Sequence, residues 1–280
     1  MKLVRYGPAG LEKPGCIDDQ GAVRDLSGVI SDISSATLSP EVLDAVMKTD
    51  VPSLPVVNDV ERFGPCVGAP GKILCIGLNY SDHAAETGAA IPEEPIIFHK
   101  AVTSLSGPND DVELPRGSVA LDWEVELAII IGREAKYVSE ADAMDYVAGF
   151  ALFNDVSERD YQNKRSGQWT KGKSHDTFAP LGPWLVTKDE VGDPHNLSMW
   201  LDVNGEKRQR GNTNTLIFNV PTVISHVSQF MTLKPGDVIP TGTPPGVGLG
   251  MKPPTFLKVG DVMTLGIEGL GEQRQTVVAA

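Results

Sequence analysis

Residues 121–132 combine an apolar, β-branched run with three acids in its first half: Leu-Asp-Trp-Glu-Val-Glu-Leu-Ala-Ile-Ile-Ile-Gly. Successive side chains of a β-strand point to opposite faces, so a strand here directs Asp122, Glu124 and Glu126 to one face. The other face receives the apolar side chains Trp123, Val125, Leu127 and Ile129. Two glutamates therefore become neighbours on one side of an otherwise apolar strand.

The two glutamates admit two interpretations. Like charges this close repel, and one carboxylate takes up a proton unless water or a cation lies between them. An antiparallel strand commonly keeps one polar, solvated face, which explains the pair without any ligand. A bound cation is the second interpretation, and the absence of Cys and His from the stretch favours Mg²⁺, Mn²⁺ or Ca²⁺ over Zn²⁺.

A third acid could complete a metal site. Residues 147–153 form a second apolar run, which ends in Asn154 and Asp155. Asp155 follows Glu126 by 29 residues, about the length of a strand, a helix and a return strand. If the second strand returns beside the first, Asp155 lies at a strand end next to the two glutamates.

The charge and composition of the chain exclude some classes of partner. At 280 residues it can bury a substantial core, and its formal charge of −13 argues against nucleic acid or an anionic membrane as a partner. Charged residues interrupt the N-terminus before an apolar signal segment can form, and no apolar run approaches the ~18 residues of a membrane span. Three cysteines without a Cys-x-x-Cys pair are typical of reduced thiols, so we expect a cytoplasmic protein.

Turn-forming residues divide the chain into two parts. The first sixty or so residues predict short strands and one helix, which Ser39 would cap and Pro40 would begin. Clusters of Pro and Gly follow between residues 51 and 71. We therefore expect a small N-terminal domain at residues 1–66 and a catalytic domain at residues 71–280. Composition and periodicity alone predict a β-rich α+β fold.

A histidine and an acid are paired early in the second part. An apolar strand at residues 73–76 leads into a short helix that Gly88 can end. His83 and Glu86 are three residues apart on this helix, so they share a face and can form a hydrogen-bonded pair. The other histidines, which we expect to be structural or exposed, are His99, His175, His195 and His226.

Three later segments carry further signals. Residues 167–183 predict a loop that holds Lys173, and residues 221–233 predict an amphipathic helix. Residues 241–248, Thr-Gly-Thr-Pro-Pro-Gly-Val-Gly, are glycine-rich but lack the Gly-Lys-Ser/Thr of a phosphate-binding loop. They predict either a turn-rich connection or an anion site lined by backbone and threonine donors.

Together these motifs resemble the fumarylacetoacetate hydrolase family. They occur in order from about Gly71 to the C-terminus: Asn79-Tyr80-x-x-His83-x-x-Glu86, Glu124-x-Glu126, Asp155-x-x-x-Arg159-Asp160-x-Gln162, Gly172-Lys173-Ser174 and residues 241–248. The resemblance implies a mixed β-sandwich roll with a small N-terminal α+β domain, a homodimer, and a Mg²⁺ or Mn²⁺ held by Glu124, Glu126 and Asp155. The N-terminal Arg5-Tyr6-Gly7 and the loop at residues 249–254 are more similar to members that act on 2,4-diketo-3-deoxy sugar acids or ureidoglycolate than to the shortest acylpyruvases.

The resemblance also implies a reaction on a small 2-oxo acid. The metal would chelate the carboxylate and keto oxygens of the substrate and act as an electron sink. Water activated by His83, which Glu86 orients, would attack the C4 carbonyl of a 2,4-dioxo acid, and the C3–C4 bond would break to release pyruvate. Lys173 would stabilise the oxyanion at C4. The residues implied in substrate binding are Arg159, Gln162 and Thr243, with Lys100 as a weaker candidate.

Other functions remain open at this point. Ureidoglycolate lyase, oxaloacetate decarboxylase and hydroxymuconate-type isomerase reactions can all use the same ion. A metal-binding scaffold without turnover is the non-enzymatic alternative. The His83/Glu86 pair argues against a scaffold, because a scaffold needs metal ligands but no base.

Overall fold

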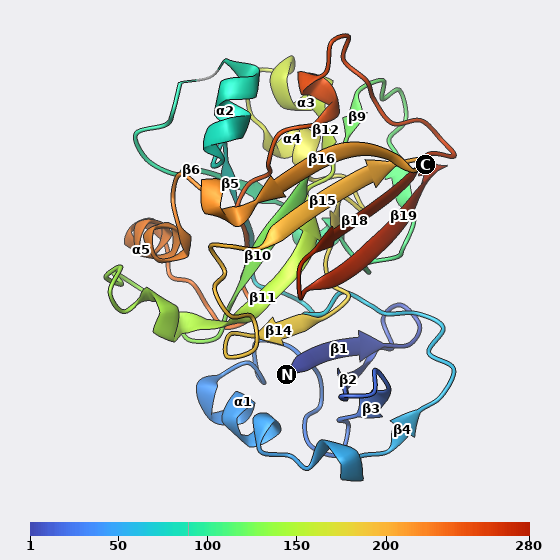
Figure 1. The fold of residues 1–280 in the computed structure, drawn as a ribbon, viewed down its shortest axis with the longest axis vertical. Coiled ribbons are helices and arrows are strands. Elements are labelled where there is room, and N and C mark those ends of the chain that lie inside the picture. The colour runs from blue at the N-terminus through green and yellow to red at the C-terminus, as the bar shows by residue number, and fades with distance from the viewer. Residues whose placement is uncertain (89) are drawn as a thin grey trace.

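The computed structural model describes residues 1–88 and 90–280. Its main element is a ten-stranded mixed sheet that runs the length of the molecule (Figure 1). In spatial order the strands of this sheet are β4 (Val56–Val57), β3 (Val23–Asp25), β2 (Lys13–Ile17), β1 (Lys2–Tyr6), β14 (Leu185–Thr187), β11 (Val147–Asn154), β10 (Val125–Ile131), β17 (Val238–Pro240), β5 (Ile73–Gly77) and β6 (Ile96–Lys100).

A second sheet covers one face of the first. Its five strands, in spatial order, are β16 (Glu206–Asn212), β15 (Ser198–Val203), β18 (Val262–Ile267), β19 (Gly271–Ala279) and β8 (Val112–Leu114). Apolar side chains of β15 and β18 pack against those of β10 and β11 in one core cluster. Two short strand pairs complete the sheets: β9 (Leu121–Asp122) with β12 (Ser157–Glu158), and β7 (Leu105–Ser106) with β13 (Ala179–Pro180). The α+β class and the sandwich of mixed sheets are confirmed.

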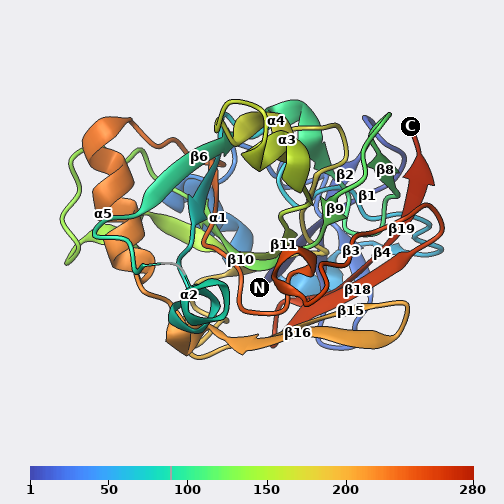
Figure 2. The same cartoon turned by 90° about the horizontal axis from the view of Figure 1, so that it is seen from above.

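Short helices lie around the sheets. They are α1 (Pro40–Met47), α2 (Ser81–Thr87), α3 (Arg159–Asn163), α4 (Thr170–Lys173) and α5 (Val220–Phe230), with 3₁₀ turns η1 (Val51–Ser53), η2 (Val102–Ser104), η3 (Ala143–Tyr146), η4 (Thr213–Thr215) and η5 (Gly248–Gly250). Seen from above, β10 and β11 run between α3 and α4 on one side and β15, β16 and β18 on the other (Figure 2). No helix in the described part of the chain is long and apolar enough to cross a membrane.

Strand β10 is buried on both faces, and so are Glu124, just before it, and Glu126 within it. Its odd-numbered residues belong to the core beneath the second sheet, while Ala128 and Ile130 belong to a second core on the opposite face. Glu124 and Glu126 share the parity of Ala128 and Ile130, so they point away from the second sheet. The solvated-face interpretation is therefore wrong, because both glutamates are buried.

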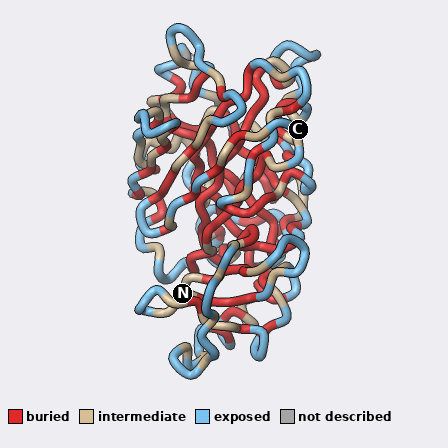
Figure 3. Tube along the Cα trace, turned by 90° about the vertical axis from the view of Figure 1, so that its right-hand side faces the viewer, coloured by how far each residue is buried: buried red, intermediate tan, exposed pale blue. Residues whose placement is uncertain are grey.

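The N-terminal strands continue the large sheet. Strand β1 pairs with β14 through Lys2↔Val186 and Leu3↔Leu185, and β2, β3 and β4 extend the sheet beyond it. Figure 3 shows buried backbone passing without interruption from the N-terminal strands into the rest of the molecule. The division into domains at residues 1–66 and 71–280 stays a prediction.

Most of the expected local elements are present. Helix α1 begins at Pro40 with Ser39 at the N-cap position, but the Ser39 side chain makes no capping hydrogen bond. Helix α2 ends at Gly88, whose φ of 68° is left-handed. The amphipathic helix expected at residues 221–233 is α5. The loop expected at residues 167–183 is partly wrong, because it contains α4 and β13. The sequence of α4, Thr-Lys-Gly-Lys, has no apolar periodicity, so a helix this short could not be predicted from it.

Candidate metal centre and active site

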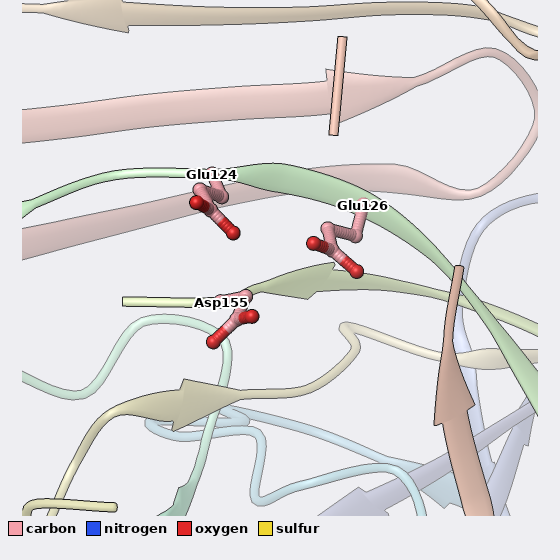
Figure 4. Close-up of side chains that lie close together, drawn as sticks. All are labelled: Glu124, Glu126 and Asp155. Atoms are coloured by element: carbon pink, nitrogen blue, oxygen red, sulfur yellow. The ribbon is translucent and has the colours of Figure 1, made fainter. Parts of the chain in front are cut away.

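Three carboxylates meet where β10 begins and β11 ends. Val125 pairs with Asn154, and the backbone N–H of Asp155 donates to the carbonyl of Glu124 at 2.9 Å, so Asp155 lies opposite Glu124. One carboxylate oxygen from each of Glu124, Glu126 and Asp155 lies within 4.8 Å of the others. The three side chains point toward one another in Figure 4, and their residues are 7%, 1% and 0% exposed.

Three cations surround this carboxylate triad. Lys173, the last residue of α4, places Nζ 2.9 Å from Oε2 of Glu124 and 2.8 Å from Oδ2 of Asp155. Lys100, the last residue of β6, places Nζ 2.5 Å from Oδ1 of Asp155. Arg159, the first residue of α3, places Nη2 2.6 Å from Oε1 of Glu124.

Glu126 differs from the other two acids. It has no ion-pair partner among the described residues, and its Oε2 accepts the backbone N–H of Gly242 at 2.8 Å. Burial, reinforced by the charges of Asp155 and Glu124, raises the pKa of Glu126 well above its ordinary value. In the metal-free protein Glu126 therefore holds a proton at pH values where an exposed glutamate is ionised.

Glu124 and Lys173 keep their charges, whereas the pKa of Lys100 shifts toward the neutral form. Burial alone would raise the pKa of Glu124, but Lys173 and Arg159 outweigh it and hold that pKa far below its ordinary value. Burial alone would lower the pKa of Lys173, but Asp155 and Glu124 outweigh it and raise that pKa. At Lys100 burial dominates, and the pKa of this lysine is lowered despite its pairing with Asp155.

These residues fit a hard divalent cation. The triad offers only oxygen ligands, at a spacing that one ion can bridge, and Glu126 is buried without an ion pair in the described part of the chain. A divalent ion would allow Glu126 to ionise, because it supplies the positive charge that the protein leaves out. The pattern Glu-x-Glu followed by Asp155 thus predicted a set of residues that the fold brings together.

His83 and Glu86 form the expected pair. Nδ1 of His83 lies 3.0 Å from Oε2 of Glu86 on α2, and His83 is 7% exposed. Both residues line a cavity of about 510 Å³ that Glu124, Glu126, Arg159, Gln162, Lys173 and Thr243 also line. The base candidate and two of the three triad acids, Glu124 and Glu126, thus line the same cavity.

The glycine-rich segment serves the protein's own carboxylates. Gly242 donates its N–H to Glu126, and Gly246 donates its N–H to Glu86 at 3.1 Å. Both glycines have positive φ, 98° and 104°, and a Cβ at position 246 would lie 2.1 Å from the carbonyl oxygen of Arg208. Residues 241–248 therefore connect Glu126 of the triad with Glu86, the acid that contacts His83.

Two expected binding residues have other contacts. The hydroxyl of Thr243 donates to the carbonyl of Val125 at 2.9 Å and accepts from Gln209 at 2.8 Å. Lys100 does not line the cavity, and its Nζ forms an ion pair with Asp155. Arg159 and Gln162 do line it, and Nη1 of Arg159 donates to Oε1 of Gln162 at 3.0 Å.

Sequence reasoning gave no role to three residues that support this site. Asp122 accepts from Nε of Arg159 at 2.8 Å, Gln209 connects Val125 with Thr243, and Asn79 donates to the carbonyl of Thr241 at 2.8 Å. Asp122 shares the face of Glu124 and Glu126 by strand parity, so its position carried a signal. Gln209 lies on β16 of the other sheet, and nothing in its local sequence indicates the contact.

Known proteins resemble this chain over its whole length. A family model described as fumarylacetoacetate (FAA) hydrolase C-terminal matches residues 72–278. A Burkholderia multivorans protein, named provisionally as a hydrolase, is 55% identical over 281 residues and covers 100% of both chains. The solved fumarylacetoacetate hydrolase of the psychrophilic Exiguobacterium antarcticum is 38% identical, with a TM-score of 0.88 over 100% of both chains. Maleylpyruvate hydrolase of Sphingobium sp. SYK-6, solved in complex with manganese(II) ion and pyruvate, is 30% identical, with a TM-score of 0.82 over 100% of both chains.

Proposed function

Because this chain belongs to the fumarylacetoacetate hydrolase family, we propose that it is a divalent-metal-dependent hydrolase that cleaves a carbon–carbon bond of a 2,4-dioxo acid. The products would be pyruvate and a carboxylic acid. The observation that carries this proposal is the His83–Glu86 contact of 3.0 Å at the wall of the cavity that Glu124 and Glu126 of the carboxylate triad also line. A metal-binding scaffold would need the triad but not a paired base.

The metal site supports the electron flow of such a reaction. Glu124, Glu126 and Asp155 would hold Mg²⁺ or Mn²⁺, which would polarise the 2-keto group and draw electrons away from the bond that breaks. Lys100 keeps Asp155 in place through its 2.5 Å ion pair, so we assign it to the support of the site. The structurally similar maleylpyruvate hydrolase of Sphingobium was solved in complex with manganese(II) ion, which is consistent with this choice of ion.

The paired base would activate water. His83 accepts a proton from water as the water oxygen forms a bond to C4, and Glu86 stabilises the imidazolium that results. The C3–C4 bond then breaks, and C3 retains the electron pair and takes up a proton to give pyruvate. The backbone N–H of Gly246 donates to the Glu86 carboxylate at 3.1 Å, which would help to keep the acid in position through the cycle.

Three cavity-lining residues would bind the charged atoms of the substrate. Lys173 would face the oxyanion that develops at C4, since its ammonium is buried beside the triad. Arg159 and Gln162 would hold the substrate carboxylate. Thr243 would form part of the wall, because its hydroxyl proton is already donated to Val125.

The rest of the cavity favours an apolar substrate tail. Outside the residues already assigned, the described lining side chains are mainly apolar: Ile76, Leu78, Phe98, Trp169, Val247, Leu249 and Met251, with Asn163 and Lys252 as the polar members. A polyhydroxylated sugar-acid tail would lose water there and find few partners, which costs free energy for each unpaired hydroxyl. We therefore favour an acylpyruvate over a 2,4-diketo-3-deoxy sugar acid.

A panel assay tests the proposal. Purified protein with Mg²⁺ or Mn²⁺ is offered acylpyruvates of increasing chain length, a 2,4-diketo-3-deoxy sugar acid, ureidoglycolate and oxaloacetate, and product formation is measured. We expect the highest kcat/KM for an acylpyruvate, with Glu126→Gln inactive as the matched control. Exclusive turnover of ureidoglycolate or oxaloacetate would replace hydrolysis by lyase or decarboxylase chemistry.

A further inference from the structure

Asp122 accepts four hydrogen bonds, three of them from parts of the chain that only the fold brings to it. Its Oδ1 accepts the backbone N–H groups of Gly248, at 2.7 Å, and Trp123, at 2.9 Å. Its Oδ2 accepts the backbone N–H of Leu249 at 2.9 Å and Nε of Arg159 at 2.8 Å. Asp122 is 0% exposed, so these donors replace water around its charge.

The two sides of this contact do different things in the cavity. Arg159 reaches the metal-binding end, because its other nitrogens contact Glu124 and Gln162. Gly248 and Leu249 belong to residues 247–252, which we call the tail loop. The tail-loop residues that line the cavity are Val247, Leu249, Gly250, Met251 and Lys252. Asp122 therefore connects the end that would bind the 2-oxo acid group with the wall that would contact the substrate tail.

The tail loop is fixed at few other points. Gly248 accepts from the backbone N–H of Thr255 at 3.0 Å, and a Cβ at position 250 would lie 3.2 Å from Oε2 of Glu86. The bonds within η5 are local, from Gly250 to Val247 and from Met251 to Gly248. Glu86 and Nε1 of Trp123 hold Gly246, just before the loop, and the Asp122 carboxylate is the group that joins the loop itself to Arg159.

We propose that Asp122 is a positioning residue. It fixes the position of the tail loop relative to Arg159 and so determines which substrate tails the cavity accepts. The inference rests on the proposed function only in taking 2-oxo acids as the ligands. An asparagine at position 122 cannot replace the aspartate, because its NH₂ group would take the place of Oδ1 or of Oδ2. In either orientation the NH₂ group would face two N–H donors and could accept from neither. Leaving two buried donors without acceptors should loosen either the loop or Arg159.

The test measures binding rather than turnover. Pyruvate and 2-oxooctanoate lack the 4-oxo group, so neither can undergo the proposed cleavage, and their dissociation constants are measured by calorimetry at saturating Mn²⁺. We expect the wild-type protein to bind 2-oxooctanoate at least about tenfold more tightly than pyruvate, because the longer tail buries apolar surface against the loop. D122N should reduce this tail preference to less than about threefold and weaken Mn²⁺ binding about tenfold, through Arg159 and Glu124.

D32N is the matched control. Asp32 likewise accepts an arginine Nε, that of Arg5 at 2.7 Å, and a backbone N–H, that of Ile33 at 2.8 Å, but it lies outside the cavity lining. D32N should change thermal stability without changing the tail preference. A D122N protein that keeps both the tail preference and the Mn²⁺ affinity within about twofold of wild type would overturn the inference, as would a wild-type protein that binds both acids alike.

A second variant covers the case in which D122N does not fold. L249P removes the N–H that Asp122 accepts and leaves Arg159 intact, and proline is tolerated in the first turn of a helix. L249A, its control, shortens the side chain but keeps the N–H. Loss of tail preference in L249P beyond that in L249A supports the inference, and equal preferences in the two variants overturn it. If the wild type shows the tail preference but hydrolyses no dioxo acid, the proposed function fails and this inference stands.

Discussion

Nζ of Lys173 lies 2.9 Å from Oε2 of Glu124, inside the carboxylate triad. The same ammonium is 2.8 Å from Oδ2 of Asp155, so it contacts two of the three acids that would hold a metal. A divalent ion that binds these oxygens must compete with Lys173 for them. The lysine would then be free to turn toward the oxygen that develops charge at C4.

Replacing Lys173 should separate metal binding from catalysis. K173M removes the positive charge that competes with the metal. We expect Mn²⁺ to bind K173M at least about tenfold more tightly than wild type, because the repulsion between the Lys173 ammonium and an ion a few Å away is lost. Hydrolysis should fall by about 10²-fold or more, because the oxyanion loses its donor. Calorimetry with Mn²⁺ and steady-state kinetics check both, with K164M as the control, since the Lys164 side chain is 74% exposed. Weaker Mn²⁺ binding in K173M would contradict the competition.

Replacing Glu126 should remove the metal and leave the fold intact. We expect EDTA to abolish activity and Mg²⁺ or Mn²⁺ to restore it, and E126Q to bind neither ion measurably. The glutamine can still accept the N–H of Gly242, and it resembles the protonated carboxyl of the metal-free protein. The melting temperature of metal-free E126Q at neutral pH should therefore equal or exceed that of metal-free wild type. A large loss of stability, or full wild-type turnover in chelator after dialysis, would contradict the assignment.

The pKa of Glu126 gives the metal-free protein a distinctive pH dependence. The pKa is raised in the folded state above the ordinary glutamate value, chiefly by burial and then by Asp155 and Glu124. Above that value the unfolded chain loses the proton and the folded chain keeps it, so the folded state binds more protons. Its stability contribution is complete below the unfolded pKa and is lost as the pH rises through the folded pKa.

Urea unfolding in EDTA across pH 5 to 9 checks this sign. The free energy of unfolding of wild type should fall relative to that of E126Q as the pH rises, because only wild type has this carboxyl. Saturating Mg²⁺ should reverse the trend for wild type, since metal binding requires the ionised form and therefore strengthens with pH. Parallel pH profiles of the two proteins in EDTA would show that Glu126 titrates normally.

The His83–Glu86 pair should be needed for hydrolysis and not for decarboxylation. H83A should keep Mn²⁺ and oxalate binding but lose about 10²–10⁴-fold in hydrolytic rate, the usual contribution of a general base. Oxaloacetate decarboxylation needs the electron sink alone, so any such activity should survive in H83A.

Glu86 supplies the matching variant. E86Q should impair hydrolysis far more than decarboxylation, because the amide cannot stabilise an imidazolium as a carboxylate does. Both reactions are measured on wild type, H83A and E86Q from pH 5 to 9 with saturating Mg²⁺. Equal losses in the two reactions would remove the distinct role of the pair and leave only the metal site supported.

The local parts of this site could be predicted from sequence. Strand periodicity placed Glu124 and Glu126 on one face, and an interval of three placed His83 beside Glu86 on α2. The apolar run that ends at Asp155 predicted a second strand, and β11 does return beside β10. These predictions succeed because the spacing of side chains along a strand or helix is set by backbone geometry.

The contacts between distant segments could not be predicted in this way. Glu86 and Gly246 are separated by 160 positions, and Asp122 and Leu249 by 127. Their hydrogen bonds depend on how β9, α2 and the glycine-rich segment come together around the two sheets. Periodicity within one segment contains no information about the partner that packs against it.

By itself the sequence determined which acids share a strand face, which histidine is paired, and, through its motifs, the family to which the chain belongs. Only the tertiary structure decided that Glu126 is the triad acid without an ion pair among the described residues. It also decided that Lys173 contacts both Glu124 and Asp155, and that Lys100 forms an ion pair with Asp155. The reason is physical: a charge is stabilised or destabilised by burial and by neighbours within a few Å, and these are set by sheet packing rather than by position along the chain.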